Sequence, residues 1–250
     1  MPFQKPTIVL VQGSFQIKEV YSKLVNALEA RQYPVVHSQL PTLTGHDEPD
    51  FASKDLQTDA AAIQNVLKHL IEDEGRRVVL LMHSYGGLVG NEAAVEELTW
   101  AKRSSLDLPG GIIYAFYVAA FVLTKGQSVL GTFGESPNND VKPNGRFTMK
   151  NAAKVIYNDL PAAEAEKWES KMIDQSYAVQ TTELTNETYK NIPSTYIVCT
   201  NDQGPPPQYQ EMFGQASQST IIRLESGHSP MLSKTEELAG LIDSAIEKAT

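Results

Sequence analysis

The sequence predicts an α/β protein with a doubly wound, mainly parallel six-stranded sheet and a helical lid insertion. Short apolar runs rich in β-branched residues alternate with longer segments whose apolar residues repeat at helical spacing. This alternation is typical of parallel strands joined by helices that cover both faces of a sheet. The chain has 250 residues, 41% of them hydrophobic, so it can bury one sizeable core. We therefore expect one domain with an insertion.

The six expected strands are near-continuously apolar, as strands covered on both faces are. They span Thr7–Gln12, Pro34–Gln39, Arg77–Met82, Gly111–Val118, Ser194–Thr200 and Ser219–Leu224. Two helical stripes lie between the first three strands, with apolar residues spaced by three or four positions. The first stripe contains Ile17, Val20, Leu24 and Leu28, and the second contains Leu56, Ala60, Ile63, Leu67 and Leu70.

The last helix is expected to begin at Ser233, because Ser233-Lys234-Thr235-Glu236 fits the pattern of a capping box. The apolar face of this helix contains Leu238, Leu241, Ala245 and Ile246. The helix should close the domain.

Residues 124–190 break the alternation, so we assign 1–123 and 191–250 to the core and 124–190 to a helical lid. The insertion opens with turn-forming residues in Gly131–Gly145 and then shows a helical pattern over Lys150–Ser176, with no strand expected. It should lie over the crevice at the carboxyl ends of the strands. Its large apolar side chains either line a pocket there or form a small core within the lid. They are Phe133, Phe147, Met149, Ile156, Tyr157, Trp168, Met172 and Tyr177.

A serine stands directly between a buried strand and a helix, at Ser84 in the segment Leu80–Leu88. This context is that of a nucleophile elbow, where small residues such as Gly86 and Gly87 are needed because strand and helix pack closely. The first glycine of G-x-S-x-G is replaced by Met82. The context, rather than the motif, therefore predicts Ser84 as a nucleophile.

Two further polar residues follow later strands. Asp202 ends the segment Tyr196–Asp202, and His228 lies in the loop after the last strand. Alone, Asp202 can be a loop or helix-cap acid and His228 a solvated loop residue. Together with Ser84 they lie beyond the carboxyl ends of three strands in the order Ser, Asp, His. We predict a triad with Ser84 as nucleophile, His228 as general base and Asp202 as the acid that orients it.

The turn after the first strand predicts an oxyanion hole made by the backbone N–H groups of Ser14 and Tyr85. For His83 the alternative stays open that it packs behind the site. Cys199 is interpreted as a small buried hydrophobe, and no metal site or cofactor is expected. The expected substrate-binding residues are Gly13, Phe15, His83, Phe121 and Trp168.

The net charge of −9 and the absence of a Lys/Arg-rich run argue against nucleic acid or acidic lipid as a partner. Met1–Pro6 carries no signal-peptide pattern, and no apolar run is long enough for a membrane span. A single cysteine excludes an intrachain disulfide. We expect a soluble, cytoplasmic protein that acts on a small molecule, and leave a homodimer open.

The chain resembles the α/β-hydrolase superfamily, and within it the compact esterases and hydroxynitrile lyases typified by plant methyl-ester hydrolases. The resemblance covers nearly the whole chain. It is carried by Leu81–Leu88, Tyr196–Asp202, Ser226–Leu232 and Ser233–Leu238. The lid segment Tyr157–Pro161, with Trp168, is similar to that of fungal members. The resemblance implies the α/β-hydrolase fold with the lid inserted into it.

The chain departs from this group at two positions near the expected site. Esterases of the group have His-Gly where this chain has Gln12-Gly13, and a glycine in place of Met82. The lyases carry Thr where Gly13 stands and Lys where Ser229 stands, so both positions favour hydrolysis. Epoxide hydrolases and dehalogenases use an aspartate nucleophile, and Ser84 argues against them.

These features predict a serine hydrolase that cleaves a small-molecule carboxylic ester or lactone through an acyl-enzyme. One alternative keeps the triad for proton transfer, as a cofactor-free lyase or biosynthetic enzyme, and Met82 and the missing His-Gly pair motivate it. A second alternative is a non-catalytic ligand receptor on a hydrolase scaffold, since a fold does not fix a function.

Overall fold

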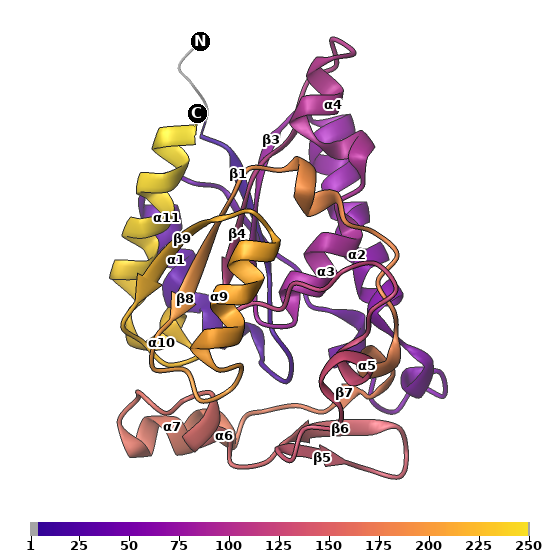
Figure 1. Cartoon of the computed structure of the whole chain (residues 1–250), viewed down its shortest axis with the longest axis vertical. Helices are drawn as coiled ribbons and strands as arrows, with labels where there is room; N and C mark the ends of the chain where they lie inside the picture. The colour runs from indigo at the N-terminus through magenta and orange to yellow at the C-terminus, as the bar shows by residue number, and fades with distance from the viewer. Residues whose placement is uncertain (1–4, 250) are drawn as a thin grey trace.

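Six parallel strands form the central sheet of the computed structural model, which describes residues 5–249 (Figure 1). The strands are β1 (Thr7–Val11), β2 (Val35–His37), β3 (Arg77–His83), β4 (Gly111–Val118), β8 (Ser194–Cys199) and β9 (Thr220–Leu224). Their order is β2-β1-β3-β4-β8-β9, and every neighbouring pair is parallel. The predicted parallel sheet is confirmed, and all six expected strands are present.

The longer helices connect these strands, and short helical turns lie in the loops. The helices outside the insertion are α1 (Ser22–Ala30), α2 (Leu56–Lys68), α3 (Gly86–Ala93), α4 (Trp100–Ser104), α9 (Pro207–Ala216), α10 (Pro230–Ser233) and α11 (Thr235–Ala249). The short turns are η1 (Lys18–Tyr21), η2 (Pro41–Leu43), η3 (Phe51–Ser53), η4 (His69–Asp73), η5 (Glu96–Leu98) and η6 (Thr188–Asn191). No helix within residues 5–249 has the length and apolar character needed to cross a bilayer.

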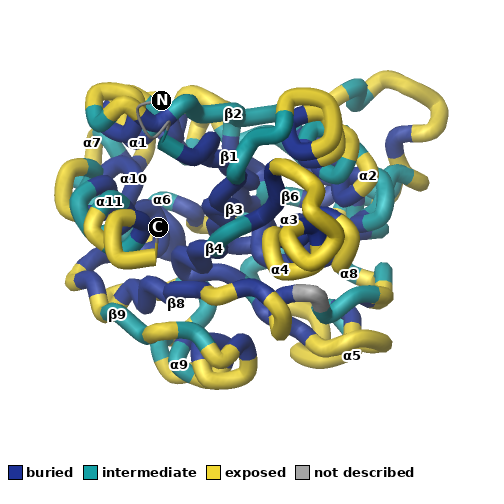
Figure 2. The backbone as a smooth tube through the Cα atoms, turned by 90° about the horizontal axis from the view of Figure 1, so that it is seen from above, coloured by how far each residue is buried: buried dark blue, intermediate teal, exposed yellow. Residues whose placement is uncertain are grey.

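Helices cover both faces of the sheet, which explains why its strands are apolar throughout. Along β1, Val9 and Val11 belong to one core cluster, whereas Ile8 and Leu10 belong to the other. The first cluster packs under α2 and α3, and the second packs under α1 and α11. Figure 2 shows the central strands buried between helices whose outer sides are exposed. The predicted doubly wound arrangement is confirmed.

The second predicted helical stripe forms α2, and its start is fixed by a capping interaction. The Asp55 carboxylate accepts a hydrogen bond from the Thr58 N–H at 3.0 Å. In return, the Asp55 N–H donates to the Thr58 hydroxyl at 3.2 Å. This reciprocal pair satisfies two N–H groups that the first helical turn leaves without partners. Burial of the apolar stripe then fixes α2 on the sheet.

The insertion between β4 and β8 lies across the carboxyl ends of the strands, at the lower end of the sheet in Figure 1. Its helices are α5 (Val129–Phe133), α6 (Ala152–Val155), α7 (Ala162–Glu169) and α8 (Ala178–Thr181). It also contains an antiparallel sheet of β5 (Asn139–Val141), β6 (Arg146–Met149) and β7 (Gln175–Ser176). The expectation that no strand interrupts this segment is therefore wrong, and the lid is not purely helical.

A tight turn between β5 and β6 is the physical reason for this difference. The Lys142 N–H donates to the Arg146 carbonyl at 2.8 Å, and Gly145 has a φ of +73°, which glycine adopts without strain. Pro143-Asn144-Gly145 is a turn signal between two short runs of strand character. The boundaries 1–123, 124–190 and 191–250 stay a prediction, and residues 1–4 and 250 lie outside the described residues.

The chain also differs from the prediction at the start of the last helix. Ser233 ends the short helix α10, and α11 begins only at Thr235. The Ser233 hydroxyl donates to Asp159 Oδ2 at 2.6 Å, so it is engaged by the lid instead of capping α11. The predicted capping box at Ser233 is therefore wrong.

The helix α3 lies unusually close to the ends of two strands. A Cβ placed on Gly86 would lie 2.2 Å from the Val11 carbonyl oxygen, and one on Gly87 would lie 2.3 Å from the Phe121 carbonyl oxygen. Both neighbours are backbone atoms, which cannot rotate away as a side chain can. Only glycine allows α3 to approach the sheet this closely.

We expect Gly86→Ala to lower the free energy of unfolding by about 2 to 4 kcal/mol, because the added methyl forces α3 away from β1. Chemical denaturation of the wild type and the variant measures this difference. Gly240→Ala is the matched control, since a Cβ there meets no atom within 4 Å in the long helix α11. That control should raise stability by up to about 1 kcal/mol, and equal effects of the two substitutions would contradict the packing account.

Candidate active site

Ser84 lies in the turn between β3 and α3 with a strained backbone. Its φ is +53°, in the left-handed region that non-glycine residues seldom adopt. The turn is held by hydrogen bonds from the Ser84 N–H to the Val118 carbonyl at 3.2 Å and from the Phe121 N–H to the Ser84 carbonyl at 3.1 Å. The strain, about 1 to 3 kcal/mol for such a residue, is therefore offset by contacts with the segment that follows β4.

Met82, which replaces the expected glycine, is accommodated below the turn. Its side chain is fully buried in the core under α3. A Cβ on Gly90 would lie only 2.3 Å from the Met82 sulfur, so the space that Met82 needs is supplied by the missing side chain on the facing helix. The side chain does not line the cavity above Ser84. This departure from the elbow motif is a packing exchange within the core.

Asp202 and His228 form a buried pair at the ends of β8 and β9. His228 Nδ1 and Asp202 Oδ2 are 2.7 Å apart, and both side chains are almost completely buried. Asp202 Oδ1 accepts from the Gly204 N–H at 2.7 Å, and Oδ2 also accepts from Gln210 Nε2 at 2.8 Å. Gln210, on α9, is fixed in turn by the Cys199 N–H, which donates to its Oε1 at 2.9 Å. The carboxylate is thus held in one orientation toward the imidazole.

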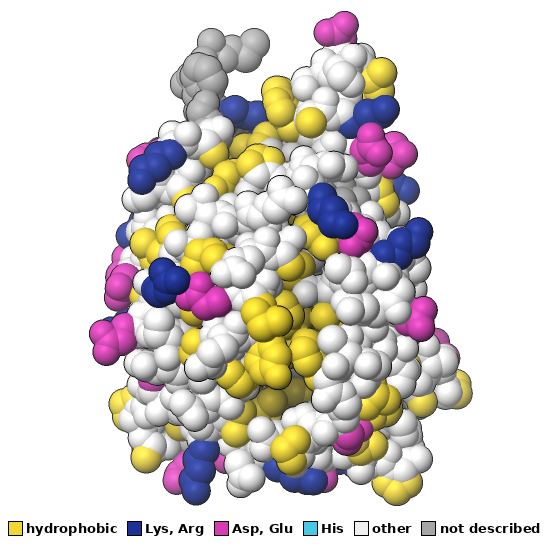
Figure 3. Space-filling view, viewed as in Figure 1, with side chains coloured by type: hydrophobic (Ala, Val, Ile, Leu, Met, Phe, Trp, Pro, Cys, Tyr) yellow, Lys and Arg dark blue, Asp and Glu magenta, His cyan; other side chains and the backbone are white. Residues whose placement is uncertain are grey.

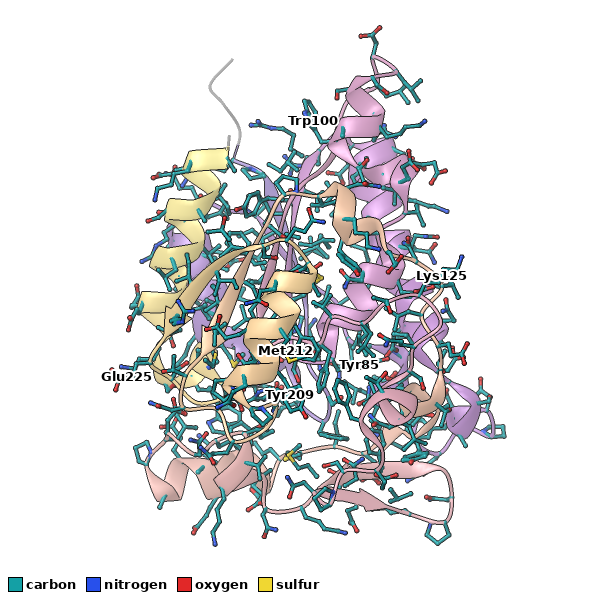
Figure 4. All side chains as sticks on the ribbon, in the orientation of Figure 1. Tyr85, Trp100, Lys125, Tyr209, Met212 and Glu225 are labelled. Carbon is teal, nitrogen blue, oxygen red and sulfur yellow. The ribbon has the colours of Figure 1, made fainter. Side chains whose placement is uncertain are left out.

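Ser84 and His228 line the same cavity, whose volume is about 450 Å³. Figure 3 shows a hollow floored by hydrophobic side chains between α9 and α5. In Figure 4, Tyr209 of α9 and Tyr85 next to α3 lie close to this region. Within the described residues, no hydrogen bond joins Ser84 Oγ to His228 Nε2. The structure therefore places both groups at the cavity without direct hydrogen bonding between them.

The predicted oxyanion-hole groups lie beside Ser84. Ser14 and Tyr85 line the cavity, and a Cβ on Gly13 would lie 2.9 Å from Ser84 Cβ, so the turn after β1 touches the serine. The backbone N–H groups of Ser14 and Tyr85 donate to no acceptor among residues 5–249. Two N–H donors without acceptors beside a serine side chain can bind an oxyanion.

A buried polar network under the cavity connects the turn after β1 with the loop that carries His228. The Tyr21 hydroxyl accepts from the Gly13 N–H at 2.8 Å and lies 2.8 Å from His83 Nδ1. His83 Nε2 donates to the His228 carbonyl at 2.8 Å. Burial, followed by the nearby His228, lowers the pKa of His83 well below its usual value. His83 is therefore a neutral link between the two loops.

Gln12, which replaces the usual histidine, belongs to the same buried layer. Its Nε2 donates to the Gln16 carbonyl at 2.6 Å, and its Oε1 lies 2.9 Å from His37 Nε2. Burial, followed by the charge of Lys18, lowers the pKa of His37 to about 4. Gln12 does not line the cavity. The second departure from the esterase pattern thus shapes the turn from beneath.

Asp59 on α2 supports Tyr85 from the opposite side. Its carboxylate accepts from the Tyr85 hydroxyl at 3.0 Å, the Thr42 N–H at 2.9 Å and the Thr42 hydroxyl at 2.6 Å. Burial raises the pKa of Asp59 to about 6, although these donors act in the opposite direction. Tyr85, which lines the cavity, is therefore anchored by a buried acid.

The structure brings most, but not all, of the expected site residues together. Ser84, His228, Ser14, Tyr85, Phe15 and Phe121 line the cavity, and Asp202 lies behind His228. Gly13, His83 and Trp168 do not line it, so the geometry places these three expected substrate contacts outside the cavity wall. Gly13 and His83 lie beneath the site, and Trp168 packs in the second core cluster with α7.

Of the eight large apolar side chains expected in the lid, four line the cavity and four do not. Those that line the cavity are Phe133, Phe147, Met149 and Ile156. Those outside its lining are Tyr157, Trp168, Met172 and Tyr177.

Two residues that organise the site, Gln210 and Tyr21, were not predicted. Gln210 lies on a helix beyond the proline-rich turn, and Tyr21 lies at the first helix, so neither carries a motif. Within residues 5–249, no cluster of three His, Cys, Asp or Glu side chains suited to a metal is present. Cys199 is buried, and burial raises the pKa of its thiol well above the usual value.

Comparisons with known proteins agree with this architecture. A sequence model described as "Alpha/beta hydrolase family" matches residues 8–241. "Alpha/beta hydrolase nvfD" of Aspergillus novofumigatus is 27% identical over 256 residues, which cover 98% of each chain. A crystal structure of a polyneuridine aldehyde esterase mutant matches with a TM-score of 0.75 and 17% identity, covering 97% of this chain and 99% of that one. A methylesterase from Arabidopsis matches with a TM-score of 0.71 and 21% identity, covering 97% and 99%. The two solved structures share the fold.

The raised pKa of Asp59 predicts a specific pH dependence of stability. The folded protein binds a proton at Asp59 below pH about 6, whereas the unfolded chain does so only below its ordinary value of 3.8. The stabilisation is complete below the lower value and is lost as the pH rises through the upper one. Relative to Asp59→Asn, the wild type should lose about 3 kcal/mol of unfolding free energy between pH about 4 and 7.

Urea denaturation of both proteins across this pH range measures the difference, in which titrations elsewhere cancel. Asp50→Asn, at an exposed position, controls for the loss of one negative charge. A difference between wild type and Asp59→Asn that does not change with pH would contradict the assignment of a raised pKa to Asp59.

Proposed function

This chain belongs to the alpha/beta hydrolase family, and on that basis we propose that it is a serine hydrolase acting on a small-molecule carboxylic ester or lactone. The proposal assigns the nucleophile to Ser84, the general base to His228 and the orienting acid to Asp202. It assigns the oxyanion hole to the Ser14 and Tyr85 N–H groups. One observation carries it: a serine, a carboxylate-paired histidine and two N–H groups without acceptors converge on one cavity.

In the first half of the reaction, His228 takes the proton of the Ser84 hydroxyl as its oxygen attacks the carbonyl carbon of the substrate. The carbonyl oxygen gains negative charge and accepts hydrogen bonds from the Ser14 and Tyr85 N–H groups. His228 then gives its proton to the leaving alcohol oxygen. The products are the free alcohol and an ester of Ser84.

In the second half, His228 removes a proton from a water molecule that attacks the acyl carbon. The same two N–H groups bind the oxyanion again. The bond to Ser84 Oγ breaks, His228 returns the proton to the serine, and the carboxylic acid leaves. For a lactone the alcohol and the acid are parts of one product, because hydrolysis opens the ring and adds the atoms of one water molecule.

The role of Asp202 follows from its hydrogen bonds. Its carboxylate faces His228 Nδ1, so the proton stays on that nitrogen and Nε2 remains available as a base toward the cavity. When His228 becomes a cation, the adjacent carboxylate stabilises it. Gln210 and the Gly204 N–H keep the carboxylate from rotating away.

The missing hydrogen bond between Ser84 and His228 supports a second candidate. Because no such bond is formed among the described residues, His228 Nε2 faces the cavity without the serine as its partner. A base in this position can also take a proton from a substrate carbon, which is the chemistry of a cofactor-free lyase or biosynthetic proton-transfer enzyme. In that case His228 is essential and Ser84 is not.

We expect Ser84→Ala to abolish turnover of short-chain aryl esters, because no other group of the cavity replaces the nucleophile. Asp202→Asn should lower kcat on the order of 10³- to 10⁴-fold, since the amide no longer fixes the imidazole tautomer. Steady-state kinetics with purified proteins measures both changes, and unfolding curves confirm that the variants are folded.

The same variants distinguish the two candidates. Loss of the native reaction in His228→Ala but not in Ser84→Ala, with no ester hydrolysis by the wild type, would favour proton-transfer chemistry. Equal turnover by the wild type and Ser84→Ala would remove the serine mechanism.

A further inference from the structure

The cavity is walled by aromatic side chains from both the core and the lid. The Phe133 ring of α5 lies 6.0 Å from the Phe121 ring, 5.8 Å from Tyr209 and 6.1 Å from Phe213, measured between centroids. All four side chains line the cavity, and Phe133 and Tyr209 are about two-fifths exposed at its mouth. A mouth of this kind provides ring faces and edges for a flat, apolar group.

Among the described residues, the cavity lining contains an acidic side chain but no Lys or Arg. None of the residues that line the cavity, all of which the structure describes, is Lys or Arg. One lining residue, Glu135, carries a carboxylate, and it lies at the exposed rim. Its Oε1 accepts from Asn139 Nδ2 at 2.6 Å, and its Oε2 accepts from the Tyr177 hydroxyl. The carboxylate is thus fixed at the entrance, and an anion entering the cavity meets a like charge and no cation.

We propose that the site takes an uncharged, ring-bearing ester, and that the carboxylate of Glu135 excludes substrates carrying an anionic group. This inference rests on the proposed function, since it names the substrate class of the same site. A volume of about 450 Å³ suits a group of two or three fused rings. A substrate carboxylate buried there would lose its hydration without gaining a Lys or Arg side chain as a partner.

The test compares three para-nitrophenyl esters of naphthoic acid whose second ring carries a methyl, a carboxylate or an aminomethyl group. Wild-type kcat/KM should be about tenfold or more higher for the methyl ester than for the carboxylate. Glu135→Lys should reduce this ratio to about threefold or less, and Glu135→Gln, which keeps hydrogen bonding to Asn139 and Tyr177, should give an intermediate ratio. Glu166→Lys, at an exposed position of α7 in the same lid, is the control and should leave the ratio unchanged.

Binding of the three esters to Ser84→Ala, measured by calorimetry, separates this inference from the proposed function. Tighter binding of the methyl ester by about tenfold supports the substrate class even where turnover is absent. Equal or tighter binding of the carboxylate would overturn it, and so would a preference for the aminomethyl ester. Hydrolysis of all three esters at equal rates would leave the serine mechanism in place and remove the charge preference.

A second, independent observation concerns the lid segment Tyr157–Asp159, which contacts three of the loops that form the site: the turn after β1 and the loops of Asp202 and His228. Gln16 Nε2, in the turn after β1, donates to the Tyr157 hydroxyl at 3.3 Å. Asn158 Nδ2 donates to the Asn201 carbonyl at 2.9 Å, next to the predicted acid. Asp159 Oδ2 accepts from the Gly227 N–H at 2.6 Å, next to His228.

This contact is closely packed and specific. A Cβ on Gly227 would lie 2.4 Å from Asn158 Oδ1 and 2.6 Å from Asp159 Oδ1, so a side chain there would displace both of these groups. Asp159 Oδ2 also accepts from the Ser233 hydroxyl at 2.6 Å, which ties the lid to α10. The segment therefore holds the loop that carries His228 at a defined position against the lid.

We infer that Asp159 is a positioning residue, which acts through the Gly227 N–H to place the His228 imidazole over Ser84. Asp159→Ala should lower kcat about tenfold or more while KM changes less than about threefold, because binding walls remain and only the base is displaced. Asp159→Asn, whose amide oxygen can still accept from Gly227, should recover most of the activity.

The rate of labelling of Ser84 by a fluorophosphonate gives a readout that does not depend on substrate, and it should fall in parallel with kcat. Asp174→Ala is the matched control, because Asp174 is another lid carboxylate but pairs with Lys142 within the lid. Gly227→Ala should reproduce the defect from the other side of the contact. Unchanged kcat in folded Asp159→Ala, or an equal loss in Asp174→Ala, would overturn the assignment.

Discussion

The close approach of α3 to the carboxyl ends of the neighbouring strands is the constraint on which the site depends. Backbone atoms of Val11 and Phe121 occupy the space that side chains at Gly86 and Gly87 would need. In the turn that leads into α3, Ser84 adopts a left-handed conformation and lines the cavity. The turn after β1 and the turn before α3 are thereby brought within contact distance. Ser14 and Tyr85, one from each turn, line the same cavity.

Buried polar groups beneath the cavity join the loops that carry the expected site residues. Tyr21 and His83 join the turn after β1 to the backbone of His228, and Gln210 holds Asp202 against the imidazole. From above, Asp159 contacts the same histidine loop through Gly227. The His228 imidazole is thus held by the Asp202 carboxylate, while His83 and Asp159 fix the backbone of its loop at His228 and Gly227. Such support restricts the base to a narrow range of positions.

The sheet and the approximate site were predictable because they depend on short-range sequence features. Strands covered on both faces are continuously apolar, and Ser84, Asp202 and His228 follow three of them in chain order. The family was recognisable from the same segments. The contacts that orient the site were not predictable, because residues such as Gln210 reach their partners only through the packing of helices on the sheet. At Ser233 a local pattern gave a wrong prediction, since a tertiary contact with Asp159 replaces the expected capping interaction.

We propose above all that Ser84 is a nucleophile activated by His228. The most direct measurement is intact-protein mass spectrometry after reaction with a fluorophosphonate, followed by peptide mapping of the adduct. We expect one adduct per chain, located on Ser84, that does not form in Ser84→Ala and forms far more slowly in His228→Ala. An adduct on another residue, or labelling of Ser84 at an unchanged rate in His228→Ala, would contradict it.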